Sequence, residues 1–93
     1  MTRAEILDTA KSMVTGQREQ DYGTPEDNFS AIARLWSAYA GYTYSAEDVA
    51  IMMCLFKIGR ITTGAGTDDS YIDLAGYAAC AGEISAKRRE AET

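Results

Sequence analysis

The 93-residue chain contains no histidine. Histidine is the usual general base near neutral pH and the commonest metal ligand. A Ser-His-Asp triad, a histidine base and a histidine metal site are therefore excluded. A single proline, Pro25, argues against a proline-rich disordered segment. No apolar run approaches the roughly 20 residues that a membrane-spanning helix needs, so we expect no membrane association.

Cations are scarce as well. Nine Lys and Arg stand against 14 Asp and Glu, which gives a net charge of -5. Non-specific DNA or RNA binding requires a basic face, so we expect no nucleic-acid partner, although a few converging cations could still bind a small anion. Cys54 and Cys80 lie in apolar segments far apart in the sequence. Without a recognisable signal peptide, they are expected to be reduced, buried thiols of a cytoplasmic protein.

What the sequence does contain is helical periodicity, and no strand-like alternation interrupts it. It predicts an all-α fold, a bundle of about four helices, in a single domain over residues 1–93. The expected helices cover residues 2–22, 24–41, 45–61 and 68–92, with Gly16 bending or ending the first. The apolar faces are predicted to be Ile6, Leu7, Ala10, Met13 and Val14; Phe29, Ile32, Ala33, Trp36, Tyr39 and Ala40; and Val49, Met52, Met53, Phe56 and Gly59.

Helix boundaries are marked clearly. Thr24 and Pro25 predict a capped helix start, and Gly41 predicts its end. Ser45 with Asp48 predicts a second capped start. The helix that follows is apolar nearly all round, which is typical of a central, buried helix.

The last helix has a stretch of small residues that would let another helix approach closely, either within the chain or across a dimer. Because a domain of this size buries only about 60–65% of its unfolded surface, we expect association into a homo-oligomer. The small residues are Ala75, Gly76, Ala78, Ala79, Ala81 and Gly82.

Lys57 and Arg60 end the third predicted helix, and Asp69 and Asp73 begin the fourth. Cations at a helix C-terminus and acids at an N-terminus are expected from the helix dipole alone, and the two pairs could form salt bridges. Alternatively, Lys57 and Arg60 could clamp a phosphate, while Asp69 and Asp73 could converge on Mg²⁺. The salt-bridge and phosphate-binding interpretations can both be true, because an acid can orient an arginine that binds a phosphate.

The segment from Arg18 to Asn28 is a second candidate. Gly23 lies between Tyr22 and a capped helix start, so free backbone N–H groups are expected beside Arg18, and helix N-termini bind anions. Tyr22 could stack on a nucleobase while Asn28 hydrogen-bonds to its edge. The alternative is a tight turn with the tyrosine packed over the proline. Trp36 could likewise stack on a base or lie in the core.

Three motifs between about residues 6 and 84 resemble a family of short phage-encoded proteins of unassigned function. They are "R…YG.P..NF..IA.LW..Y.G", "D.A.MM…K..R" and "D…D..GY". The resemblance implies a protein of the infected bacterium's cytoplasm and adds Tyr77 to the candidate site. The residues that carry it are Arg18, Tyr22, Gly23, Pro25, Asn28, Phe29, Ile32, Ala33, Leu35, Trp36, Tyr39, Gly41, Asp48, Ala50, Met52, Met53, Lys57, Arg60, Asp69, Asp73, Gly76 and Tyr77.

The Lys, Arg and double-Asp part is also similar to the all-α nucleotide pyrophosphohydrolases of the MazG-like group. Those enzymes hold Mg²⁺ with an E-x-x-E pair on one helix and an E-x-x-D pair on another. This chain has no E-x-x-E, and its E-x-x-D, Glu5 to Asp8, lies near the N-terminus with no partner pair before it. A metal site of that kind would lack half of its ligands.

These resemblances point to nucleotides, and the missing acids argue against hydrolysis. The leading hypothesis is a phage protein that sequesters a nucleotide immune signal, such as a cyclic dinucleotide or an ADP-ribose derivative, with no metal or other cofactor. Its phosphates would meet Arg18, Lys57 and Arg60. Its base would stack on Tyr22 or Trp36, and Asn28, Asp69 and Asp73 would read ribose or base groups.

Two alternatives remain open. One is a Mg²⁺-dependent nucleotide pyrophosphohydrolase in which Asp48, Asp69 and Asp73 hold the metal with help from Glu47. In that enzyme Lys57 and Arg60 would offset the charge of the phosphates. The other is a module that binds a host protein through its small-residue helix.

Overall fold

The computed structural model of the chain describes residues 1–92, apart from the side chains of Gln17, Arg18 and Ala65. Every regular element among these residues is helical, which confirms the predicted all-α class. The predicted first helix is divided at Gly16 into a long and a short helix. The elements are α1 (Arg3–Val14), α2 (Gln17–Tyr22), α3 (Pro25–Ala40), α4 (Ala46–Arg60), the π-helical turn η1 (Ile61–Ala65) and α5 (Asp68–Glu92).

The predicted caps are present. The Thr24 side chain accepts a hydrogen bond from the Asp27 backbone N–H at 3.2 Å. Ser45 and Asp48 form a reciprocal capping box, with distances of 3.0 and 2.9 Å. These contacts satisfy backbone N–H groups that have no partner inside a helix. As predicted, Gly41 ends α3, so the sequence alone places the turn between α3 and α4.

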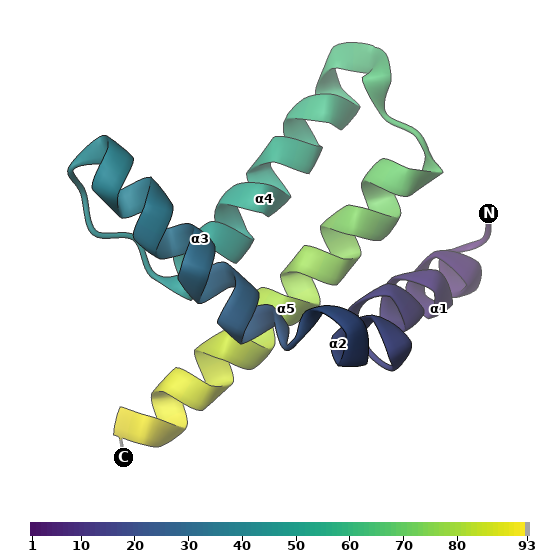
Figure 1. The fold of residues 1–93 in the computed structure, drawn as a ribbon. Helices are drawn as coiled ribbons and strands as arrows, with labels where there is room; N and C mark the ends of the chain where they lie inside the picture. Colours follow the sequence, from purple (N-terminus) through teal and green to yellow (C-terminus); the bar gives the residue numbers. More distant parts are fainter. Residues whose placement is uncertain (93) are drawn as a thin grey trace.

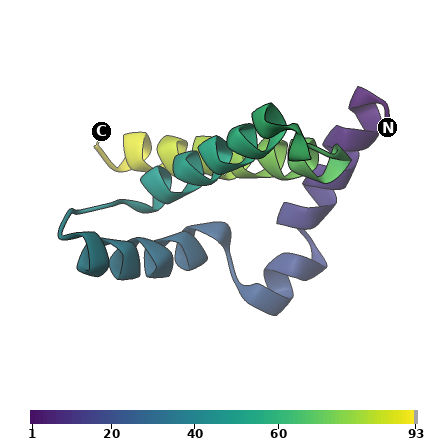
Figure 2. The ribbon, with the colours of Figure 1, turned by 90° about the horizontal axis from the view of Figure 1, so that it is seen from above.

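The helices form two layers around an antiparallel hairpin of α4 and α5 (Figure 1). Viewed from above, α4 and α5 lie in one layer, α2 and α3 lie below them, and α1 crosses at one end (Figure 2). α5 packs against α4 and α1, while α3 packs mainly against α4. None of the helices in residues 1–92 is both long and apolar enough to cross a membrane.

The core lies between α3, α4 and the second half of α5. Val49 is fully buried at its centre, and Trp36 and Tyr77 pack against its edge. The two cysteines carry no disulfide, Cys80 being buried and Cys54 half-buried. The buried members of the core are Phe29, Ala33, Val49, Ala50, Cys80, Ala81 and Ile84.

Two sequence-based expectations about burial are wrong. In α4, Val49 and Ala50 are fully buried as a central helix requires, but Phe56 is 55% exposed and Gly59 is also exposed, so its second half does not face inward as predicted. α4 packs between α3 and α5, and α5 packs between α1 and α4. Tyr39 was expected on the apolar face of α3 and is 96% exposed. Apolar character therefore overestimates burial in this chain, because the single chain is too small to cover all of its apolar faces.

Part of the small-residue stretch is used within the chain. A side-chain carbon at Gly76 would lie 3.2 Å from Cγ1 of Val14, so α1 can approach α5 closely only because no side chain intervenes. Gly82 differs, since it is exposed and nothing lies near it. The close helix approach predicted from sequence thus occurs at Gly76, between α1 and α5.

Candidate functional site

A cavity of about 490 Å³ opens where the α1–α2 joint meets α3 and α5. Its volume falls within the roughly 300–1,000 Å³ of ligand pockets in proteins. We call it the main cavity. Five of the ten candidate binding residues from the sequence line it: Tyr22, Gly23, Asn28, Asp73 and Tyr77. They come from two segments far apart in the sequence, and the packing of α5 beside α1 and α3 brings them together.

Backbone geometry at Gly23 fixes one wall. Gly23 has φ of +83°, a conformation that is strained for residues with a side chain. Its N–H donates to the Glu19 carbonyl at 2.8 Å and so ends α2. Thr24 then caps α3 immediately. This tight reversal places Tyr22 and Asn28, which lie on different helices, on the lining of one cavity.

An aromatic pair forms the inner wall. The rings of Phe29 and Tyr77 lie 6.0 Å apart between centroids and are tilted by 47°, within the distance range of interacting aromatic pairs. Phe29 is buried and Tyr77 is half-buried. Tyr22 is 67% exposed and therefore lies at the mouth of the cavity. The main cavity thus offers an apolar interior with a third ring at its entrance.

A salt bridge connects the cavity to α4. Lys57 Nζ lies 3.0 Å from an Asp73 carboxylate oxygen, and the two side chains are only 21% and 26% exposed. The charges along the sequence allowed this pairing, and it leaves further N–H donors on the lysine ammonium. Glu19 supplies a second carboxylate to the described lining.

Other sequence-predicted residues lie elsewhere. Arg60 ends α4 and Asp69 lies in the first turn of α5; both are exposed and outside the described lining of either cavity. Trp36 packs against the core. The backbone of Arg18 belongs to α2, but its side chain lies outside the described residues.

The acids of the magnesium alternative are not brought together by one chain. Asp48 begins α4, whereas Asp73 pairs with a lysine near the end of that helix. At 1.5 Å per residue, the nine residue steps from Asp48 to Lys57 separate these two positions by roughly 14 Å. Within residues 1–92, the described side chains form no cluster of three or more acids or cysteines that could hold a metal ion.

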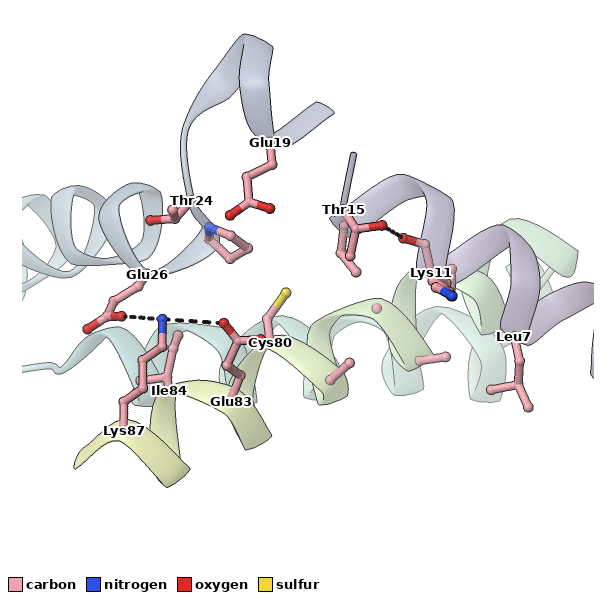
Figure 3. A pocket seen from close by; sticks show the side chains of 16 residues that line it. Leu7, Lys11, Thr15, Glu19, Thr24, Glu26, Cys80, Glu83, Ile84 and Lys87 are labelled. Carbon is pink, nitrogen blue, oxygen red and sulfur yellow. Dashed lines mark hydrogen bonds and ion pairs between the residues drawn. The ribbon is translucent and has the colours of Figure 1, made fainter. Parts of the chain in front are cut away.

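A second cavity, of about 280 Å³ (Figure 3), shares lining residues with the first. Val14, Pro25 and Gly76 are among the residues common to both linings. At one end, Lys87 of α5 forms ion pairs of 3.3 Å with both Glu26 and Glu83 (Figure 3). The Lys87–Glu26 pair ties the start of α3 to α5, and one lysine between two carboxylates leaves a net negative charge at that end.

Cys80 also lines both cavities. Burial raises the pKa of its thiol, and the nearby Glu83 carboxylate raises it further. Burial likewise raises the pKa of Cys54, whose Sγ lies 3.9 Å from the Leu74 carbonyl oxygen. Both thiols are therefore protonated near neutral pH, and Cys80 lines the two cavities as an apolar group rather than a nucleophile.

Sequence reasoning missed the contribution of α1. Met13 and Val14 line the main cavity together with Ile72 of α5. They were assigned only to apolar helix faces. The sequence signal that could have indicated them is Gly16. A glycine that ends a helix directly after its apolar face marks the point where that face is no longer covered and can line a cavity.

These features define a small all-α protein with a ligand-sized, partly apolar cavity. Over residues 5–85 the chain matches the family described as a domain of unknown function (DUF6378), and it belongs to that family. It is similar to the Gene 55 protein of Mycobacterium phage L5, with 47% identity over 74 residues, and to the Gene 55 protein of Mycobacterium phage D29, with 40% identity over 87 residues.

Those alignments cover 78% and 94% of this chain but 47% and 58% of the relatives. The chain thus spans about half the length of the curated relatives it matches. No solved structure matches it. The expected relationship to phage proteins is therefore confirmed.

Proposed function

We propose that this protein binds a small nucleotide in the main cavity and sequesters it without cleaving it. The observation that carries the proposal is the convergence of Tyr22 and Asn28 with Asp73 and Tyr77 on one cavity of about 490 Å³. Aromatic rings, an amide and a carboxylate are the groups that recognise the base and ribose of a nucleotide. The ligand class that we favour is a nucleotide immune signal, such as a cyclic dinucleotide or an ADP-ribose derivative.

The base would enter the apolar interior. The Phe29–Tyr77 pair offers a hydrophobic wall. Tyr22 at the mouth can stack on a nucleobase that lies between this wall and its own ring. Base–aromatic stacking is worth about 1–3 kcal/mol per base. Asn28 can both donate and accept a hydrogen bond, so its amide matches the edge of a nucleobase.

The phosphates would meet cations at the edge of the cavity. Asp73 holds Lys57 at 3.0 Å in a half-buried position, which leaves further N–H donors on the ammonium for a phosphate oxygen. Arg60 lies one helical turn further along α4. The Asp73 carboxylate can at the same time accept a hydrogen bond from a ribose hydroxyl or a base amine.

Sequestration is favoured over cleavage by the placement of the acids. Metal-dependent phosphoryl chemistry needs carboxylates that converge on the ion, and Asp48 lies at the opposite end of α4 from the Lys57–Asp73 pair. Relatives in mycobacteriophages fit a role during infection. A phage gains from a protein that removes a host signal, and such removal requires only binding.

The test is calorimetric titration of the protein with ADP-ribose, cyclic dinucleotides and ATP, with Mg²⁺ or with EDTA. We expect one nucleotide to bind with the same affinity in Mg²⁺ and in EDTA, and to be recovered intact by chromatography. Asn28→Ala should weaken binding about five- to tenfold, since a hydrogen bond is worth about 1–1.5 kcal/mol. Tyr39→Ala is the matched control, because Tyr39 is 96% exposed and outside the described lining of the cavity.

Two results would contradict the proposal. If no nucleotide binds at millimolar concentration, the cavity has another ligand. If pyrophosphate or a nucleoside monophosphate is released and Asp73→Asn abolishes that release, the protein is a hydrolase like those of the MazG-like group.

A further inference from the structure

The outward side of α4 is apolar. Ile51, Leu55 and Ile58 follow one another at four- and three-residue steps and are 44%, 61% and 43% exposed. Gly59 lies in the same turn as Ile58 and is exposed too. We call these four residues the outer face of α4. Phe56, 55% exposed, lies at its edge.

This face is also uncharged. Between Asp48 and Arg60 the helix has one charged residue, Lys57, and its ammonium is turned to Asp73 of α5. An exposed helix side normally carries charged or polar residues. The second half of α5 shows the ordinary pattern, with Glu83, Lys87 and further charged residues facing solvent.

The chain as a whole exposes more surface than a folded monomer of its mass. A 10.1 kDa monomer is expected to have about 5,300 Å² of accessible surface, and this chain has 6404 Å². The excess of roughly 1,100 Å² exceeds the ~800 Å² that each partner buries in a standard interface. The radius of gyration, 14.0 Å, is likewise larger than the roughly 12 Å expected for this length.

We propose that the outer face of α4 is the contact between two copies of this chain. In a two-fold dimer the same patch serves both partners, so Leu55 of one copy packs beside Leu55 or Ile51 of the other. In Figures 1 and 2 α4 lies at the edge of its layer, with α5 on one side and α3 below its first half, so a second α4 has access to it.

Gly59 gives independent support for a close-packed partner. Glycine inside a helix is unfavourable relative to alanine, and within the chain nothing lies within 4 Å of where its side chain would begin. The single chain therefore gives no packing reason for glycine at this position. A second helix crossing the outer face of α4 does, because the missing side chain lets the two backbones approach.

The test compares two leucines of equal exposure. Leu55 on α4 and Leu7 on α1 are both 61% exposed, so Leu55→Glu and Leu7→Glu make the same chemical change at the same degree of burial. Sedimentation equilibrium of the wild-type chain between about 1 and 100 μM should give twice 10.1 kDa or a higher multiple. Leu55→Glu should weaken self-association at least roughly thirtyfold, the effect of losing an interface hot spot, and Leu7→Glu should leave it unchanged.

Gly59→Ala provides a second variant that cannot fail by unfolding, because alanine favours the helix. It should weaken self-association, whereas in a monomer it would only raise the melting temperature. The proposal is overturned if the wild-type chain stays monomeric at 100 μM, or if neither Leu55→Glu nor Gly59→Ala changes an oligomer that does form. A wild-type monomer would mean that another occupant covers this face.

Discussion

The Lys57–Asp73 salt bridge gives a quantitative test of the reasoning, since it is the described contact that links α4 to the main cavity. The two charged atoms lie 3.0 Å apart, and the side chains are 21% and 26% exposed. Exposed pairs contribute about 0.2–1 kcal/mol, while breaking a fully buried pair costs about 3–5 kcal/mol. For a pair of intermediate burial we expect a coupling free energy of about 1–2 kcal/mol.

The assay is a double-mutant cycle of Lys57→Met, Asp73→Asn and the double variant, each unfolded in urea. With a slope of about 1 kcal/mol per M for a small domain, each single variant should lower the unfolding midpoint by roughly 1–2 M. The double variant should lose less than the sum of the two. Protein concentration must be held constant, because self-association adds to apparent stability.

The same variants separate structure from ligand binding. Lys57→Met should also lower nucleotide affinity by about tenfold or more, the loss of one charge-assisted hydrogen bond. A coupling free energy below about 0.3 kcal/mol would refute the packing argument. A normal coupling energy with unchanged affinity would leave the salt bridge intact and remove Lys57 from the proposed binding site.

Three further predictions test other parts of the structure. Arg60→Ala should change the free energy of unfolding by less than about 0.5 kcal/mol, because Arg60 is exposed and forms no ion pair among the described residues. If the proposed phosphate contact exists, nucleotide affinity should fall roughly tenfold. A lower melting temperature with unchanged affinity would contradict this prediction. Gly76→Leu should destabilise the fold by about 1–3 kcal/mol in urea because it overpacks against α1, whereas Gly82→Leu should not, and equal effects would be inconsistent with the α1–α5 packing. Burial raises the pKa of Cys80, so above about pH 8.5 the thiol loses its proton in the unfolded state but keeps it in the folded state, and the free energy of unfolding should fall as the pH rises. Cys80→Ser should make this pH dependence weaker, as measured by urea titrations between about pH 7 and 10.

The elements of the fold were predictable from local signals. Thr24, Ser45 and Gly41 mark helix boundaries through hydrogen bonds and dihedral angles that depend only on near neighbours in the sequence. Burial was less predictable, because it depends on which helix faces meet. Tyr39 and Phe56 sit on apolar faces, yet a chain of this size has too few helices to cover them.

The candidate site shows the same division. Tyr22, Gly23 and Asn28 could be grouped from sequence because they flank one helix start. That Asp73 and Tyr77 join them in one cavity follows from the position of α5 between α1 and α4, which no local pattern encodes. Similarly, Arg60 and Asp69 suit a phosphate or metal site by residue type, but the fold places both outside the described lining.

The close contact between Val14 and Gly76 has a consequence for the order of folding. α4 and α5 are neighbours in the sequence and can pair early, whereas the Val14–Gly76 contact closes a loop of about two thirds of the chain. α1 is thus expected to dock last and to open first, so amide hydrogens of Arg3–Val14 should exchange with solvent before those of the α4–α5 hairpin. Since α1 supplies a wall of both cavities, each such opening removes that wall, and a ligand bound there is expected to stay no longer than α1 stays docked on α5.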